Sequence, residues 1–470
     1  TRVNYGYDSR YLLEFDLGYN GSEQFAPSNR FGTFPAFSAG WIISNEKFMA
    51  STKSWLDNLK VRGSWGRVGS DGYTGSSSRR FLYMDNISFG TSQWASGLGT
   101  GSVRSISISK YANPNLKWET ADKFDVGFDI GVLKCLTLTM DYYKEKRKDI
   151  LINRNSVPVF QGTPLSTIPM YNMGRIDNNG LEFELGFNKN VAKDLNINAK
   201  VNWGTNHNIV KEWDEAERDE SYPYRYRTEG YPLGQCWGYK IDYSSNDGFF
   251  VSKEDVEHYG QTYNEATGAW EGQKITYASG SPRPGDFKYV DLNGDGVIDD
   301  HDVMPLKHST TPGITWGCSL GLDYKNVDFA IFFAGLGRFS QNYSGSNVYE
   351  VTGAGCYYEY QRTAWTAERW ANGDKITYPA LSTTTSVSLR ANDFFTMKRS
   401  YTRLKNLIIG YTLPRTWLKA VGIKSLRVYA SGENLFVWDS LRMKHIDPEQ
   451  SDAIGYPISK NMTVGVNVNF

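Results

Sequence analysis

The sequence lacks the features that mark several classes of protein. Its 470 residues carry 51 Lys and Arg against 51 Asp and Glu, and this balance argues against a nucleic-acid-binding protein. No apolar run reaches the ~18 residues that a transmembrane helix needs. Four cysteines are too few and too widely spaced for a disulfide scaffold or a Cys-x-x-Cys metal pair, and the spacing leaves their pairing open: Cys135, Cys236, Cys318 and Cys356.

Recognisable catalytic motifs are also missing. There is no GxxxxGK[ST] phosphate loop and no HExxH zinc motif, and the five histidines are scattered. The sequence therefore predicts no enzymatic activity. The chain begins TRVNYGYDSRY, without the basic and apolar regions of a signal peptide. We expect that the numbering starts after processing or that part of the N-terminus is missing.

What the sequence does have is alternation. Aromatic residues make up 15% of the chain and there are 46 glycines. Leu136, Leu138 and Met140 alternate with Thr137 and Thr139. The same period of two recurs in residues 13–19, 124–130, 181–187, 195–203 and 462–470. Several segments alternate for about ten residues, enough for a tilted strand to cross a bilayer. The pattern predicts an all-β transmembrane barrel; a soluble β-sandwich, whose strands also alternate but are usually ~5–6 residues long, is the alternative.

The connections between these segments alternate in length. Short turns are followed by long polar connections, as in outer-membrane barrels. About 13 strands are expected, starting near residues 2, 11, 34, 57, 118, 136, 179, 195, 313, 326, 399, 424 and 458. Because single-chain bacterial barrels have even strand numbers, 13 strands indicate the C-terminal portion of a larger barrel. The longest loops are expected at 206–312 and 341–398.

One loop carries a metal-binding pattern. Residues 291–302 read DLNGDGVIDDHD and fit the calcium-loop template D-x-[DN]-x-[DN]-G. The expected ligands are Asp291, Asn293, Asp295, the Val297 carbonyl, Asp299 and Asp302. No helix pair flanks the loop and residues 287–290 resemble a strand, so the prediction is a structural Ca²⁺ and not a calcium sensor. The alternative is an acidic turn without an ion.

Aromatic side chains are frequent in the long loops. Stacking faces beside polar groups suit the recognition of sugars or peptides, and the candidate ligand-binding residues are Tyr224, Arg225, Trp237, Trp270, Tyr358 and Trp365. The alternative is that these rings pack the loops together. Residues 359–371 are also predicted to form a short amphipathic helix.

Several segments in a fixed order resemble one family. They include RVNYGYDSRYLLEF, LDNLKVRGSWGRVG, NPNLKWETADKFDVGFD, MGRIDNNGLEFEL, GDFKYVDLNGDGVIDDHD, RSYTRLKNLIIGYTLP, SGENLFVW and the ending YPISKNMTVGVNVNF. Residues 1–470 thereby resemble the C-terminal barrel portion of SusC/RagA-type TonB-dependent outer-membrane transporters of the Bacteroidota. The resemblance implies a 22-stranded barrel in the outer-membrane lipid of a Gram-negative bacterium, with the plug domain and first strands absent from this chain. It also implies that Phe470 is the signal read by the barrel-assembly machinery.

The same resemblance implies a function. Such transporters import oligosaccharides or oligopeptides into the periplasm, are energised by TonB and pair with a SusD-like surface lipoprotein. Two alternatives from other classes stay open: a passive porin or siderophore-type receptor without a lipoprotein lid, and a soluble calcium-dependent carbohydrate-binding β-protein. The sequence does not distinguish glycan from peptide.

Overall fold

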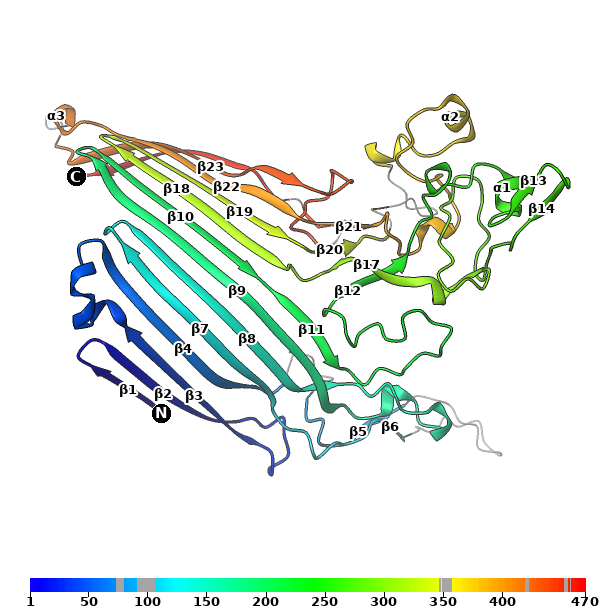
Figure 1. Cartoon of the computed structure of the whole chain (residues 1–470), viewed down its shortest axis with the longest axis horizontal. Coiled ribbons are helices and arrows are strands. Elements are labelled where there is room, and N and C mark those ends of the chain that lie inside the picture. Colours follow the sequence, from blue (N-terminus) through cyan, green and yellow to red (C-terminus); the bar gives the residue numbers. More distant parts are fainter. Residues whose placement is uncertain are drawn as a thin grey trace. The chain divides into compact units, whose positions relative to one another are not determined.

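The computed structural model divides into two compact units (Figure 1). It describes residues 1–72, 80–90, 106–345, 348, 357–418, 422–451, 455–456 and 458–470. The first unit consists of Thr1–Lys189, Asn202–Ala216 and Thr228–Pro232, and the second of Asn190–Val201, Glu217–Arg227 and Leu233–Phe470. Within the described ranges, no helix is both long and apolar enough to cross a membrane.

Antiparallel strands build most of the first unit. They are β1 (Arg2–Tyr7), β2 (Tyr11–Gly21), β3 (Phe31–Ile42), β4 (Leu56–Ser70), β7 (Glu119–Val132), β8 (Leu136–Ile152) and β9 (Tyr171–Ala192). Each pairs with the next in this order. β11 (His207–Glu212) adds to the first half of β9, and β5 (Asn86–Phe89) pairs with β6 (Ile106–Lys110) in a separate hairpin.

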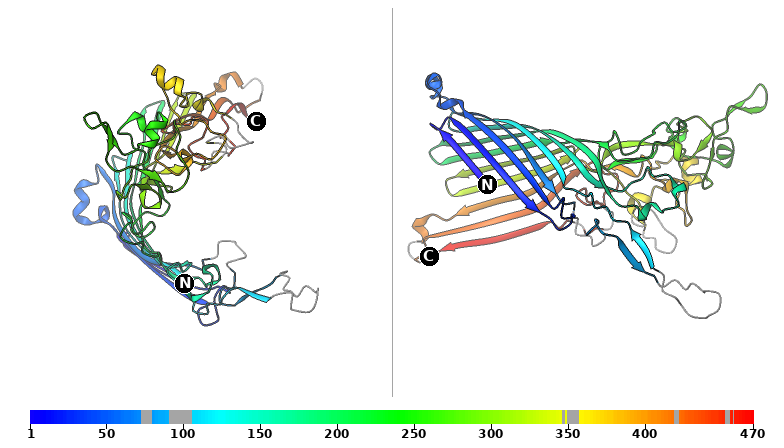
Figure 2. Two further views of the ribbon diagram at one scale, coloured as in Figure 1. Left: turned by 90° about the vertical axis from the view of Figure 1, so that its right-hand side faces the viewer. Right: turned by 90° about the horizontal axis from the view of Figure 1, so that it is seen from below.

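The second unit combines long strands with structured loops. Its long strands are β18 (Ile314–Tyr324), β19 (Val327–Gly337), β22 (Tyr401–Thr412), β23 (Ser425–Asp439) and β24 (Asn461–Asn469), and β10 (Leu195–Thr205) is divided between the two units. Short elements in and around its loops are β12 (Gln235–Tyr239), β13 (Thr262–Asn264), β14 (Ala269–Glu271), β15 (Thr276–Tyr277), β16 (Val297–Ile298), β17 (Val303–Ser309), β20 (Ser340–Asn342), β21 (Thr396–Lys398), α1 (Lys253–Glu257), α2 (Ala367–Asn372) and α3 (Arg415–Leu418). Figure 2 shows the loops of this unit, in green and yellow, gathered at one end of its strands.

The prediction of 13 antiparallel strands is confirmed. The strand order is β1-β2-β3-β4-β7-β8-β9-β10-β18-β19-β22-β23-β24, with β11 beside this path. The largest difference from the expected boundaries is at β9, which begins at Tyr171 and not near residue 179. Its polar first half is extended because it is paired on both sides, with Ile150–Ile152 of β8 and with β11. Pairing of the backbone thus overrides the weak alternation of that segment.

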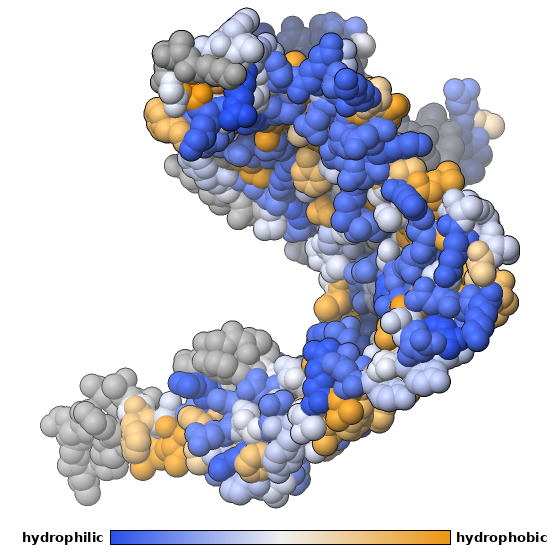
Figure 3. Space-filling view, turned by 90° about the vertical axis from the view of Figure 1, so that its left-hand side faces the viewer, coloured by the Kyte–Doolittle hydropathy of each residue, from blue (hydrophilic) through white to orange (hydrophobic). Residues whose placement is uncertain are grey.

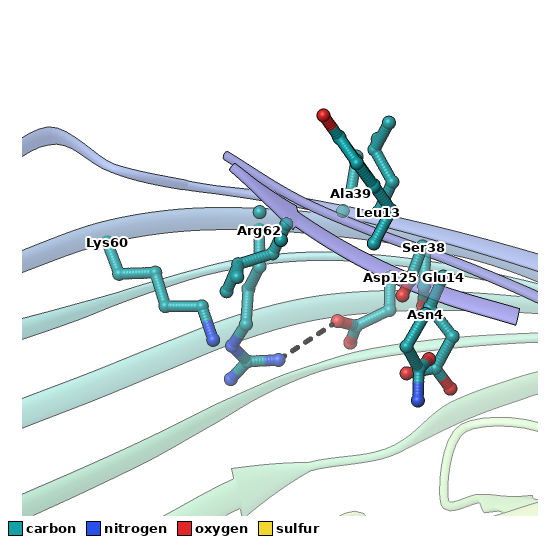
Figure 4. Close-up of a pocket in the computed structure, with 14 residues that line it drawn as sticks. Asn4, Leu13, Glu14, Ser38, Ala39, Lys60, Arg62 and Asp125 are labelled. Carbon is teal, nitrogen blue, oxygen red and sulfur yellow. Dashed lines mark hydrogen bonds and ion pairs between the residues drawn. The ribbon is translucent and has the colours of Figure 1, made fainter. Parts of the chain in front are cut away.

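Alternation along the strands produces an apolar and a polar face. Figure 4 shows Leu13 on one side of the sheet of the first unit and Arg62 with Asp125 on the other. On the polar face, the Arg62 guanidinium lies 2.7 Å from Asp141 and 3.4 Å from both Asp125 and Asp129. Figure 3 views the protein from the side of the short turns, where hydrophilic residues predominate and apolar ones are scattered. The division of the strands into an apolar and a polar face suits a barrel wall with lipid on one side and water on the other.

Candidate functional site

Long loops of the second unit form a compact body that we call the loop cluster: residues 217–227, 233–312, 340–345, 357–400 and 440–451. The main hydrophobic core of this unit lies in the loop cluster and not between its strands. β12 pairs with β17, β15 with β16, and β20 with β21, so segments far apart in sequence are joined by short ladders. Such packing gives loops enough rigidity to hold a binding site.

Tyr289 lies at the centre of this core and is fully buried. Its hydroxyl donates a hydrogen bond to the Val387 carbonyl at 2.8 Å and accepts one from the Asn392 amide at 3.0 Å. Next to it, the buried Asp286 carboxylate accepts a hydrogen bond from the Ser388 hydroxyl at 2.9 Å and another from Ser386. Tyr289 and Asp286 thus have hydrogen-bond partners in the interior of the loop cluster, which offset the cost of burying their polar groups.

The predicted calcium loop folds as a tight acidic turn. The Asp291 carboxylate accepts hydrogen bonds from the backbone N–H groups of Gly294 and Gly296, at 2.7 and 2.8 Å. Both glycines have positive φ, and a Cβ on Gly296 would clash with the Gln273 side chain. Asp295 accepts a hydrogen bond from the backbone of Val297 at 2.7 Å. The first half of the loop is therefore held by its own carboxylates.

The second half of the loop is closed by a buried aspartate. Asp302 accepts hydrogen bonds from the backbone N–H groups of Leu292 and Asp299, at 2.7 and 2.9 Å. Burial raises the pKa of Asp302, and the negative charges of Asp291 and Asp299 raise it further. A cation beside these carboxylates would offset that repulsion.

The six predicted ligands lie in one short loop, and all six donors are oxygen atoms, the type that Ca²⁺ prefers. Asn293 lies beside Asp295, donating a hydrogen bond to its carboxylate at 2.9 Å. In the described part of the chain, no three His, Cys, Asp or Glu side chains are gathered closely enough to hold a metal ion. The residue types fit a calcium site, and the carboxylates now engaged with backbone N–H groups would have to turn towards the ion.

Two of the predicted ligand-binding aromatics meet in the structure. The rings of Tyr224 and Trp237 pack edge to face with their centroids 5.7 Å apart. Arg225 forms an exposed ion pair with Glu217 at 3.0 Å, and the guanidinium of the nearby Arg227 lies over the Trp237 ring. Arg227 also reaches Asp300 at 2.9 Å, which ties this segment to the calcium loop.

The other three aromatics are placed separately. Trp270 stacks on His258 with 4.1 Å between ring centroids, within the β13–β14 hairpin region. Tyr358 stacks on His445 at 4.2 Å. Trp365 is only 6% exposed and belongs to the core of the loop cluster, so its ring offers little surface to a ligand. Among these six residues, the contacts described bring together only the rings of Tyr224 and Trp237.

The predicted helix at 359–371 is wrong in its extent. The structure has a 3-10 turn at Glu359–Gln361 and the separate helix α2, which spans six residues. α2 starts where the Thr366 side chain accepts a hydrogen bond from the Arg369 backbone and ends at Gly373, whose φ is +70°. These caps and the packing of Trp365 between the two turns override the helical periodicity.

Cys135, Cys236 and Cys318 are free, and Cys356 lies outside the described residues. Any pairing that involves Cys356 therefore also lies outside the described part of the chain.

A cavity of about 610 Å³ opens on the loop cluster and was not predicted from the sequence. Its lining comes from six separated stretches of chain: Tyr243, Asp247, Phe249, Phe287, Tyr360, Ile376, Thr377, Phe394, Arg442 and Met443. No local motif connects these residues, and only the frequency of loop aromatics hinted at such a site. Its volume and its mostly apolar lining are typical of ligand pockets.

The model of the β-barrel of TonB-dependent receptor-like proteins matches residues 1–435. The chain belongs to this family. It is 28% identical to the TonB-dependent receptor SusC of Bacteroides thetaiotaomicron and 26% identical to the TonB-dependent receptor P26 of Formosa agariphila, with the whole chain aligned to 43% and 45% of those proteins. Among solved structures, the RagAB peptide transporter superposes with a TM-score of 0.71 at 22% identity, over the whole chain and 47% of that chain.

These comparisons confirm the resemblance to the SusC/RagA type and the transmembrane all-β fold. The family consists of outer-membrane receptors and transporters and not of enzymes, and its members reside in the outer membrane. The chain spans about half the length of the curated relatives that it matches. The alternative of a soluble carbohydrate-binding β-protein is thereby overturned.

Proposed function

We propose that this chain is the C-terminal barrel portion of an active importer that carries oligopeptides or oligosaccharides across the outer membrane into the periplasm. The observation that carries the proposal is the alignment of the entire chain with SusC-type receptors. The sheet supplies a wall with a polar, ion-paired face, and the loop cluster supplies a folded body in which ligand can be captured. RagAB, which shares the fold, is a peptide transporter, and this supports nutrient import as the general role.

The proposed mechanism has three components beyond this chain. A SusD-like surface lipoprotein covers the loops and delivers ligand, a plug closes the barrel, and TonB displaces the plug using the proton-motive force. Phe470 directly follows β24 and is exposed, as suits our proposal that it is read during barrel assembly. Tyr224, Arg225, Trp237, Trp270 and Tyr358 remain our proposed contributors to ligand recognition.

We also propose that residues 291–302 bind a structural Ca²⁺ that rigidifies the loop cluster. Asp291, Asn293, Asp295, Asp299 and Asp302 would supply side-chain oxygens, and Val297 a backbone carbonyl. Calorimetric titration of the chelator-treated protein should show uptake of one Ca²⁺, and Asp291→Asn should abolish it. The exposed loop substitution Asp219→Asn is the control. Absence of calcium uptake by the unmodified protein would contradict the proposal.

Uptake by intact cells tests the function directly. Cells that carry the full-length protein should accumulate labelled oligopeptides or oligosaccharides, and deletion of its gene or loss of TonB should abolish accumulation. Affinity purification should also recover a surface lipoprotein. Uptake that persists without TonB, together with purification of the barrel alone, would favour a passive porin. Uptake of a ferric siderophore without any lipoprotein would favour a siderophore-type receptor.

A further inference from the structure

The cavity of the loop cluster has an apolar floor and a polar mouth. Phe249, Phe287, Phe394 and Met443 form the floor and are buried. Phe287 stacks on Phe249 with 5.2 Å between ring centroids and packs against Phe394 at 5.1 Å, so the floor is one continuous set of rings. A floor without hydrogen-bonding side-chain groups favours an apolar group of the ligand, because hydroxyl groups placed there would lose their partners.

Arg442 supplies the positive charge of the mouth. Its guanidinium carbon lies 4.7 Å from the centre of the Phe394 ring, so the planar group is stacked on the edge of the floor. Burial raises the pKa of both the Tyr243 hydroxyl and the Asp393 carboxylate, and Arg442 lies close enough to both for its positive charge to lower each pKa in part. Among the described residues, no carboxylate forms an ion pair with Arg442. Its fork of N–H donors therefore remains available for a bidentate contact with a carboxylate of the ligand.

The short distance between the Arg442 guanidinium and the apolar floor limits which ligands can contact both. Because the guanidinium is only 4.7 Å from a floor ring, one residue of the ligand must carry both the anionic and the apolar group. The C-terminal residue of a peptide with a large apolar side chain meets this requirement. A neutral oligosaccharide offers no charge for Arg442 and would bring hydroxyl groups onto the floor.

Asp247 also lines the cavity. Its backbone is in the left-handed region, with φ of 51°, which is uncommon for a residue other than glycine, and its carboxylate is exposed. Thr377 is also exposed at the mouth. These two polar side chains can accept hydrogen bonds from the backbone N–H groups of the residues that precede the ligand's last one.

We propose that this cavity binds the C-terminal residue of a peptide, with its carboxylate on Arg442 and its apolar side chain on the Phe249–Phe287–Phe394 floor. The inference rests on the proposed import function and names one ligand class and one subsite for it. At about 610 Å³, the cavity also has room for part of the preceding residues.

A binding experiment with a chemically matched pair of probes tests the proposal. The probes are an acetylated pentapeptide that ends in phenylalanine, as the free acid and as the C-terminal amide. Calorimetry uses the full-length protein, purified together with any lipoprotein that accompanies it. We expect the amide to bind at least ~10-fold more weakly, since a hydrogen-bonded charge contributes about that much. Equal affinity for acid and amide would overturn the proposal.

Two substitutions locate the effect. Arg442→Gln should weaken binding of the free acid ~10-fold and leave acid and amide with equal affinities. The matched control is Arg390→Gln, because Arg390 is also stacked on aromatic rings of the loop cluster but does not line the cavity; it should keep the preference for the acid. Thr377→Trp changes an exposed residue and should block the mouth. Unchanged binding in Arg442→Gln or Thr377→Trp would overturn the proposal, as would binding of a neutral oligosaccharide that Thr377→Trp abolishes.

Failure of this subsite can be separated from failure of the import function. If TonB-dependent peptide uptake is normal in cells and unaffected by both substitutions, the subsite is wrong and the importer stands. If no TonB-dependent uptake occurs at all, the proposed function itself fails.

Discussion

Apolar side chains point outward in the strands and inward in the loop cluster. In the strands of the second unit, Val464 is 79% and Phe436 is 57% exposed, whereas Phe287 and Tyr289 in the loop cluster are 1% and 0% exposed. Both regions obey the same hydrophobic effect, but the strands have lipid as a solvent for their apolar face and the loops have only each other. The region that would be irregular surface in an ordinary protein is here the one with a conventional core.

The two regions are also stabilised by different kinds of interaction. The strands are held by backbone ladders that require no particular side chain, such as the eleven-residue register between β18 and β19. The loop cluster is held by specific contacts of individual buried side chains, such as those of Tyr289. We therefore expect single substitutions to damage the loop cluster more than the wall, and the following predictions test this expectation.

The largest effect is expected from Phe287→Ala. Removing a buried ring leaves a cavity, and such changes typically lower the free energy of unfolding by ~3–5 kcal/mol. Hydrogen exchange of the loop cluster in detergent micelles measures the loss. The matched control is Phe436→Ala in β23, whose exposed ring leaves no cavity and should not alter exchange in the loops. Equal losses in the two variants would break the contrast between wall and loop cluster.

A slightly smaller loss of stability is expected from substitution of Arg403, which lies in β22 and contacts the loop cluster. Arg403 is buried and lies 2.6 Å from Asp447 and 2.7 Å from Glu449. Arg403→Ala would leave Asp447 without its cation, at a cost below the ~3–5 kcal/mol that is typical of a fully buried pair, because Glu449 keeps Lys405 at 2.7 Å. Protease resistance of residues 440–451 should fall sharply. Loss of the exposed ion pair between Arg362 and Glu359, whose atoms are 3.3 Å apart, should change the free energy of unfolding by less than ~1 kcal/mol. A loss of stability as large as that of Arg403→Ala would contradict the role of burial.

Calcium should stabilise the loop cluster and leave the barrel wall unaffected. An ion that binds only the folded loop stabilises it by ~2.7 kcal/mol when its concentration is 100 times the dissociation constant. Added Ca²⁺ should therefore slow proteolysis of the loop cluster and leave the heat stability of the barrel wall unchanged. Asp291→Asn should remove the protection. Calcium protection of the wall and loops alike would place the ion elsewhere.

The smallest effect concerns pH. Burial lowers the pKa of His308 from its ordinary value of 6.5, and the positive charges of Lys398 and Arg338 lower it further. Below pH 6.5 the unfolded chain thus binds a proton that the folded chain resists, so stability is complete above that value and is lost as the pH falls towards the folded pKa. Proteolysis of the loop cluster should accelerate below pH 6.5, and less so in His308→Gln. An acceleration on raising the pH instead would show that the sign is wrong.

Strand positions could be predicted because period-two alternation is a local property. The starts of β1, β2, β8 and β10 agree with the expectation, whereas the polar first half of β9 was missed because its partners, β8 and β11, are defined only by the fold. The glycines and carboxylates of residues 291–302 could be placed in one turn for the same local reason. Trp365 could not be placed, since nothing in its neighbourhood shows whether a loop aromatic faces solvent or a core.

The sequence by itself determined the strands, the acidic loop and the family, because each depends on residues close together or in a fixed order. Only the tertiary structure decided which loop aromatics are buried and that Phe249, Phe287, Phe394 and Arg442 surround one cavity. These residues are separated by up to 193 positions (442 − 249) and meet through packing of the long loops, a non-local outcome that no periodicity encodes.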